Sequence, residues 1–120
     1  MALDPATLSP PIVEAEILRF VGLLERATQA VAKRGRASAE ADADYRLAYA
    51  KAILDAEGTV QEREAQATVA TQAEYRTRKI AEASLDAARD AGRSMREQLG
   101  ALRSVNANLR PLVDHALGEG

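Results

Sequence analysis

The chain has 120 residues, a formal net charge of −2 and no cysteine. The lack of cysteine excludes disulfides, thiolate zinc sites and cysteine nucleophiles. Hydrophobic residues make up 47% of the sequence, but there is one Phe, no Trp and three Tyr, and alanine is abundant. Because alanine buries little area, the composition favours a thin helical rod, as a single domain over 1–120, rather than a thick globular core.

The first predicted element is a helix arm over 10–57, after an irregular tail over 1–9. Ser9 is the expected N-cap, and Pro10 follows at a first-turn position where its missing N–H is not needed. A stripe spaced alternately by three and four residues, as in a coiled coil, runs along this arm. It consists of Ile17, Phe20, Leu24, Ala27, Val31, Arg34, Ser38, Ala41, Tyr45, Ala48 and Ala52. The helix either continues through Gly35 or breaks there. We favour the continuous helix, because one interior glycine costs only about 1 kcal/mol.

A turn at Gly58-Thr59 is predicted next. Glycine enters the left-handed conformation of a helix C-cap without a Cβ clash. Thr59 and Glu62 form a Thr-x-x-Glu capping box, in which Thr59 is the N-cap of the following helix. The chain is therefore expected to fold back on itself here.

The second predicted arm is a helix over 60–108, with Pro111 ending it near Asn108 and a polar tail over 111–120. The inward residues expected in its first half are Val60, Ala67, Val69, Ala73 and Ile80. A clearer stripe follows at Ala81, Leu85, Ala88, Gly92, Met95, Leu99, Leu102, Asn106, Leu109 and Val113. The two arms match in length, so the predicted fold is all-α, a long antiparallel, coiled-coil-like helical hairpin.

The hairpin predicts which residues face each other. Tyr45 should face the region of Gln72, and Tyr75 the region of Asp42, so that Tyr45, Tyr49 and Tyr75 cluster. The favoured interpretation is that the rings fill space left by alanines, and the alternative is stacking on a base or ligand. Arg34 should face the region of Ala83, which brings two basic stretches together.

Charge is sorted along the sequence. Residues 40–74 hold eight acids and three bases, whereas residues 75–110 hold eight bases and four acids. Five arginines share one face of the second arm: Arg89, Arg93, Arg96, Arg103 and Arg110. Such a stripe either contacts phosphates or is a solvated helix face, and the second interpretation is favoured because acids interleave and no aromatic residue lies beside it.

The sequence contains no convincing catalytic set. The single histidine, His115, lies in the predicted tail, and neither a phosphate-binding glycine loop nor a Glu-x-x-His motif occurs. We therefore expect no enzyme, no cofactor and no metal site.

The sequence has more apolar residues than the two arms of the hairpin can bury against each other, which predicts contacts with other chains. The stripe of Leu85, Met95, Leu99, Leu102 and Leu109 is expected to be covered by a second chain, giving a homo-oligomer. Leu47, Ile53 and Leu54 lie outside the first stripe and suggest another contact near the turn. The start of the sequence lacks a signal peptide and no run is long enough to cross a membrane, so a cytoplasmic location is expected.

Three stretches resemble small coiled-coil proteins from the early, replication or recombination regions of tailed bacteriophages. They are Tyr45-Arg46-Leu47-Ala48-Tyr49-Ala50-Lys51-Ala52, Glu57-Gly58-Thr59-Val60-Gln61-Glu62-Arg63-Glu64-Ala65, and Leu102-Arg103-Ser104-Val105-Asn106-Ala107-Asn108-Leu109-Arg110. The resemblance implies a phage source, and hence the cytoplasm of a bacterial host, and it transfers no site.

The favoured function is a non-enzymatic binding protein, accessory to phage DNA metabolism. The alternatives are a host-takeover protein that inhibits a host enzyme, and a structural or assembly protein. A protein partner is expected, and the arginine stripe allows weak, non-specific binding of nucleic acid.

Overall fold

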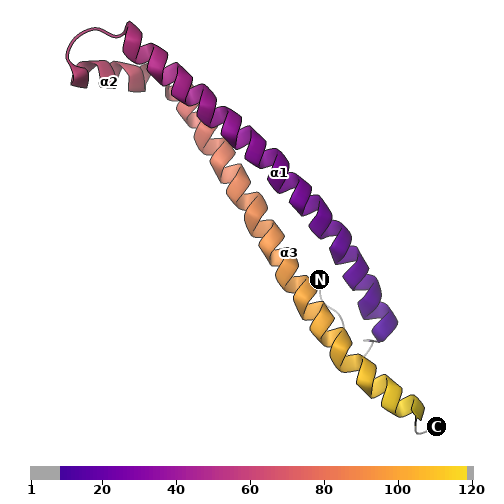
Figure 1. Ribbon diagram of the computed structural model, residues 1–120. Helices are drawn as coiled ribbons and strands as arrows, with labels where there is room; N and C mark the ends of the chain where they lie inside the picture. The colour runs from indigo at the N-terminus through magenta and orange to yellow at the C-terminus, as the bar shows by residue number, and fades with distance from the viewer. Residues whose placement is uncertain (1–8, 119–120) are drawn as a thin grey trace. The chain divides into compact units, whose positions relative to one another are not determined.

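The computed structural model describes residues 9–118, and these residues form helices and turns without any strand. The helices are α1 (Pro10–Asp55), α2 (Val60–Ala70) and α3 (Gln72–Gly118) (Figure 1). The predicted all-α helical hairpin is confirmed. Contacts group the chain into two compact units: unit 1 combines Met1–Thr28 with Asp90–Gly120, and unit 2 is Gln29–Arg89.

Unit 1 pairs the start of α1 with the later part of α3. Helix α1 begins at Pro10, as predicted, and the carbonyl of Ser9 accepts a hydrogen bond from the Val13 N–H at 3.0 Å. Val13 is fully buried, and Leu99 is 4% exposed. Phe20 and Ala27 are also buried. The two helices run antiparallel here, since Glu14 pairs with Arg110 while Ala27 lies beside Gly92.

Unit 2 contains the rest of α1, the whole of α2 and the start of α3. Its core consists of small side chains: Ala41, Ala56, Ala67 and Thr71 are its buried residues. The helices again run antiparallel, since the Tyr45 ring contacts the Tyr75 ring edge-to-face and the Arg34 guanidinium donates a hydrogen bond to the Ser84 hydroxyl.

The predicted stripe on α1 matches the side of the helix that is covered. All of its members are buried or half-buried except Arg34, whose guanidinium nevertheless reaches Ser84 on α3. Helix α1 continues through Gly35, as favoured from the sequence. A Cβ placed on Gly35 would lie 4.0 Å from Leu85 Cδ1, so the glycine marks no break and no tight approach.

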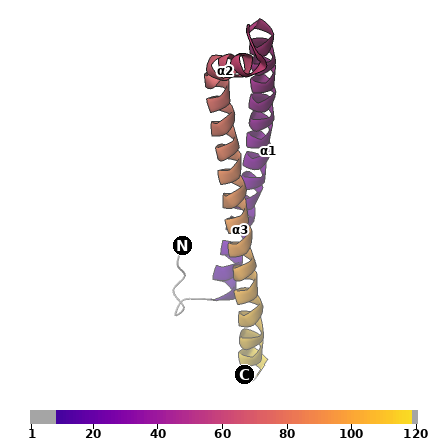
Figure 2. The same cartoon turned by 90° about the vertical axis from the view of Figure 1, so that its left-hand side faces the viewer.

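The turn is confirmed at Gly58 and Thr59. Gly58 has a φ of +112°, which L side chains rarely adopt, and the Thr59 hydroxyl accepts a hydrogen bond from the Glu62 N–H at 3.2 Å. Helix α1 ends at Asp55, two residues before the predicted end, so Gly58 lies within the connection rather than directly at the helix cap. Figure 2 shows α2 passing across from the end of α1 to the start of α3.

The prediction of one continuous second arm over 60–108 was wrong at its start, because the helix breaks at Thr71. The Thr71 hydroxyl donates to the Ala67 carbonyl at 2.7 Å, and the Thr71 N–H donates to the same oxygen at 3.0 Å. Threonine back-bonding of this kind bends helices. The Thr71 carbonyl then accepts the N–H of Tyr75 at 2.9 Å, as the first bond of α3.

The inward positions predicted before this break were also largely wrong. Ala67 is fully buried, but Val60, Val69 and Ile80 are 71%, 75% and 63% exposed, and Ala73 is exposed. The covered positions follow a three-and-four spacing that passes through polar residues instead, namely Thr71, Glu74 and Arg78, and continues at Ala81.

The facing register differs slightly from the prediction. Tyr45 lies against Tyr75, about one helical turn beyond Gln72, and Arg34 meets Ser84, next to the predicted Ala83. The shift arises because the early end of α1 and the break at Thr71 change the length of the connection between the paired helices.

The second arm also extends further than predicted. Helix α3 continues through Pro111 to Gly118 instead of ending near Asn108. Proline removes its own N–H bond to the carbonyl four residues earlier, but residues after it can still donate to their own partners, so the helix resumes. The predicted irregular tail over 1–9 lies outside the described residues except for Ser9, and the side chains of Val113 and His115 also lie outside them.

Candidate interaction surfaces

Helix α2 is exposed on nearly all sides. Among its eleven residues Ala67 is the one that is buried. Val60 and Val69 are exposed, as is Leu54 near the end of α1, at 82%. A hydrogen bond from the Gln66 amide to the Glu57 carbonyl, at 2.9 Å, ties α2 to the connection before it. This end of unit 2 therefore offers aliphatic side chains to a partner.

The same part of the chain is rich in carboxylates. Residues 55–70 contain four acids and one base: Asp55, Glu57, Glu62, Glu64 and Arg63. The region predicted to be acidic is thus the region in which α2 exposes its valines.

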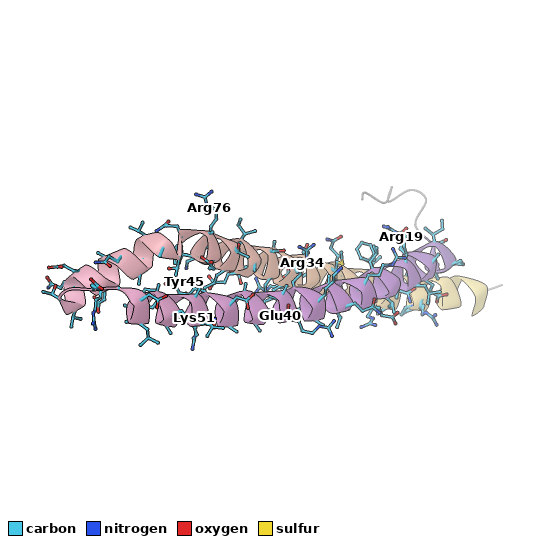
Figure 3. The ribbon with its side chains drawn as sticks, turned by 90° about the horizontal axis from the view of Figure 1, so that it is seen from above. Arg19, Arg34, Glu40, Tyr45, Lys51 and Arg76 are labelled. Atoms are coloured by element: carbon cyan, nitrogen blue, oxygen red, sulfur yellow. The ribbon has the colours of Figure 1, made fainter. Side chains whose placement is uncertain are left out.

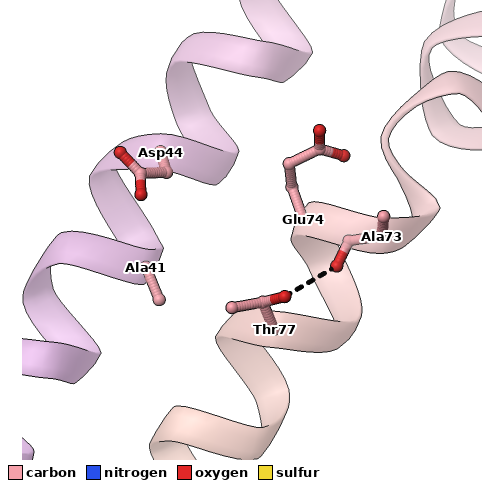
Figure 4. Close-up of a pocket in the computed structure, with 5 residues that line it drawn as sticks. All are labelled: Ala41, Asp44, Ala73, Glu74 and Thr77. Atoms are coloured by element: carbon pink, nitrogen blue, oxygen red, sulfur yellow. Dashed lines mark hydrogen bonds between the residues drawn. The ribbon is translucent and has the colours of Figure 1, made fainter.

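Grooves run between α1 and the start of α3. One, of about 240 Å³, is lined by Ala41 and Asp44 from α1 and by Ala73, Glu74 and Thr77 from α3 (Figure 4). The Thr77 hydroxyl donates to the Ala73 carbonyl at 3.0 Å, so it is used within its own helix. Glu74 Oε2 is buried without a hydrogen-bond partner in the described residues. The groove has no nucleophile–base pair, and the described residues contain no group of ligands that could hold a metal ion.

The three tyrosines cluster as predicted. The ring centroids of Tyr45 and Tyr75 lie 5.7 Å apart in an edge-to-face arrangement, and those of Tyr45 and Tyr49 lie 6.0 Å apart. The Arg78 guanidinium lies 5.2 Å from the centroid of Tyr45. Figure 3 shows Tyr45 between the two helices. Tyr45 and Tyr49 are half-buried and Tyr75 is 42% exposed, so the cluster packs at the edge of the helix pair, which is a structural role.

The arginine stripe is mostly engaged by nearby acids. Arg89 and Arg93 pair with the acids three residues before them, at 3.8 Å and 3.1 Å, and Arg110 pairs with Glu14. Arg96 and Arg103 form no ion pair within the described part of the chain. The Arg96 guanidinium lies over Gly92, with Nη1 3.7 Å from the position of a Cβ there.

The members of the leucine stripe that is predicted to contact a second chain are partly or fully buried within this chain. Leu99 is 4% exposed, and Leu85, Met95, Leu102 and Leu109 are half-buried. Other apolar side chains are more exposed than this stripe: Leu18, Leu47 and Leu54 on α1, Val60 and Val69 on α2, and Ile80 on α3.

The outer face of α1 in unit 2 carries a second apolar stripe. The sequence predicts a contact at two of its members, Leu47 and Leu54. Leu47 and Leu54 are 57% and 82% exposed, while Ile53 is half-covered. Ala43 and Ala50, also exposed, complete a spacing of four, three and four with the two leucines. In the sequence this stripe is visible only as alanine alternating with leucine at a spacing of three and four residues. Because alanine is common throughout the chain, the pattern is not distinctive.

Charged residues flank this outer stripe. Asp44 and Lys51 lie seven residues apart on one side of it, and neither forms an ion pair within the described residues. By contrast, neighbouring Arg46 pairs with Asp42 at 3.0 Å. Figure 3 shows Lys51 projecting away from the paired helix.

In the part of the chain described here, no helix combines the length and apolar character needed to cross a membrane. Comparisons with protein-family models, with curated proteins and with solved structures find no match to this chain.

Proposed function

We propose that this protein is a non-enzymatic helical-hairpin binding protein of phage type, and that α2 docks on a protein partner. The observation that carries the proposal is that α2 buries a single alanine, Ala67, while exposing Val60 and Val69.

The energetics of short helices support a docking role for α2. An isolated helix of fewer than about 12 residues is marginal in water, and helices in proteins gain most of their stability from packing an apolar face. Helix α2 has 11 residues and one buried side chain, so packing within its own chain stabilises it little. A partner that covers Val60 and Val69 would supply the missing burial, at roughly 25 cal/mol per Å² of apolar surface.

The surrounding charge indicates the chemistry of the partner. Four carboxylates and one arginine lie within residues 55–70. A protein surface with an apolar groove and a basic rim would match them. Such rim charges mainly raise the association rate and select against acidic partners, and both effects weaken with salt.

The resemblance to phage early-region proteins supports a role accessory to phage DNA metabolism. In this setting the partner is a replication or recombination protein encoded by the phage. The alternatives are a host enzyme that the acidic end of unit 2 inhibits and, as a structural role, a component of the virion. The identity of the captured partner separates these three cases.

Affinity capture from infected host cells tests the proposal. We expect the wild-type protein to retain a specific partner, and a variant with Val60→Ser and Val69→Ser to lose it. Leu18→Ser is a matched control, because Leu18 is 73% exposed in unit 1, close to the exposure of the two valines. Equal capture by wild type and the valine variant would contradict docking through α2.

A further inference from the structure

We propose that the outer stripe of α1, formed by Ala43, Leu47, Ala50 and Leu54, pairs with the same stripe of a second copy of this chain. The two copies of α1 run antiparallel, and Lys51 of each contacts Asp44 of the other. This contact shares Leu54 with the aliphatic surface near α2, but it uses neither Val60 nor Val69 and does not depend on the docking of α2.

The stripe has the form of a helix–helix contact that lacks its partner. Its spacing of four, three and four residues is that of a coiled-coil seam. It points away from the covered side of α1, which contains Ala41, Tyr45 and Ala48. Leu47 and Leu54 expose 57% and 82% of their surface, and no described part of the chain covers them.

The order of large and small residues fits a second copy of the same stripe. When two identical stripes run antiparallel, Leu47 of one copy can lie on Ala50 of the other, and Leu54 on Ala43. Each leucine then enters the space above an alanine, and the small residues allow the helices to approach closely. A two-fold axis makes each contact occur twice.

The flanking charges agree with the same alignment. In this register Lys51 of one copy lies within about one helical turn of Asp44 of the other, on the same side of the interface. The two residues cannot satisfy each other within one chain, because seven residues of helix separate them by roughly 10 Å. Both lack an ion-pair partner in the described residues, so pairing between copies supplies one for each.

The ends of the stripe limit the strength of the contact. Glu40 and Glu57 lie beyond its apolar residues, and antiparallel pairing brings them towards each other. The apolar part covers about 12 residues, or roughly 18 Å of helix. A short contact closed by like charges gives a weak, two-fold dimer rather than a filament.

Sedimentation equilibrium tests the proposal with charge reversals. The wild type should dimerise with rising concentration over about 10 µM to 1 mM. Asp44→Lys alone and Lys51→Asp alone should each weaken the dimer about tenfold or more, because each creates two like-charge contacts. The double variant with both substitutions should restore it, since it exchanges the two partners.

Matched controls separate this contact from general effects of mutation. Leu47→Ser should abolish the dimer, whereas Leu18→Ser, at a leucine of similar exposure in unit 1, should leave it intact. All these positions are exposed, and circular dichroism should confirm unchanged helix content in each variant. A wild type that stays monomeric to 1 mM overturns the proposal. So does a dimer that resists either charge reversal, or one that the double exchange does not restore.

Discussion

Arg78 of α3 and Asp42 of α1 form an ion pair, with Nε 2.9 Å from Oδ1, that joins the two helices of unit 2. Both side chains are partly shielded, at 27% and 33% exposure, and Arg78 also reaches Glu82 at 3.2 Å. Its guanidinium lies beside the ring of Tyr45. A charged residue therefore occupies a position of the helix pair where an apolar one is usual.

Arg78→Ala should lower the free energy of unfolding by about 1–2 kcal/mol, through the loss of the ion pair and of the packing of its stem on Tyr45. Arg46→Ala is the matched control, because Arg46 also pairs with Asp42 but is 75% exposed. Its loss should cost about 0.5 kcal/mol or less. Urea denaturation measures both, and equal losses would mean that Arg78 is no more than a surface charge.

Gly58→Val should destabilise the protein by about 1–3 kcal/mol, because the φ of +112° is unfavourable for a β-branched residue. A Cβ there would also lie 3.2 Å from Glu62 Cδ and meet the Glu62 carboxylate. The midpoint of thermal unfolding measures the effect. An unchanged midpoint would place the strained turn elsewhere.

The helical glycines should behave in the opposite way. Gly22→Ala and Gly100→Ala should each stabilise the protein by up to about 1 kcal/mol, since alanine has the higher helix propensity. A Cβ at either position meets nothing within 4 Å. Denaturant midpoints measure the gain, and a loss at both positions would indicate that these surfaces are covered by a partner chain.

Leu99→Ala should cost about 2–4 kcal/mol, because Leu99 is 4% exposed and its truncation leaves a cavity in unit 1. Leu18→Ala, at a 73% exposed site on α1, should change stability by less than about 0.5 kcal/mol. The cost at Leu99 should not depend on protein concentration. A loss of stability that changes with protein concentration would support the prediction that a second chain covers the leucine stripe.

Any binding of DNA should rest on Arg96 and Arg103, the two members of the arginine stripe without an ion pair in the described residues. They lie roughly 10 Å apart along α3. We expect micromolar or weaker affinity that falls with salt, with a slope near 0.9 for each phosphate contacted.

Reversing both arginines to glutamate should abolish that binding, measured by fluorescence anisotropy with single- and double-stranded DNA. The control reverses Arg89 and Arg93, whose charges acids already offset. Equal binding by wild type and the Arg96 and Arg103 variant would leave the stripe a solvated helix face.

Much of the fold could be predicted because its signals are local. Ser9-Pro10 marks the start of α1, Gly58 and Thr59 mark the turn, and each acts through its own backbone conformation. The seam of α1 was also readable, because Phe20, Leu24 and Val31 recur at coiled-coil spacing.

The errors arose where polar residues occupy the seam. Thr71, Glu74 and Arg78 continue the covered stripe, but a search for apolar periodicity passes over them and selects Val69 and Ile80 instead. Arg78 pairs with Asp42 of α1, a partner that the local sequence does not reveal. The break at Thr71 likewise depends on a side-chain bond to Ala67 that competes with regular helix geometry.

The sequence indicates that exposed acidic and apolar surfaces exist, but not which residues form each of them. The acidic region near the turn is evident from the number of acids there. A further contact at Leu47 and Leu54 is indicated because both residues lie outside the stripe of α1. That a second chain covers the leucine stripe on α3 stays a prediction, because Leu99 is buried within this chain while Leu85, Met95, Leu102 and Leu109 are half-buried.

The weak attachment of α2 has a consequence for its motion. One buried alanine, the bond from Gln66 to Glu57 and the joint at Thr71 hold this helix, so its local opening should require far less energy than unfolding of α1 or α3. Amide hydrogens of α2 should accordingly exchange with solvent well before those of its neighbours. A partner would then meet a helix that opens readily, and holding it closed would reduce the measured affinity while allowing α2 to adapt to surfaces of different shape.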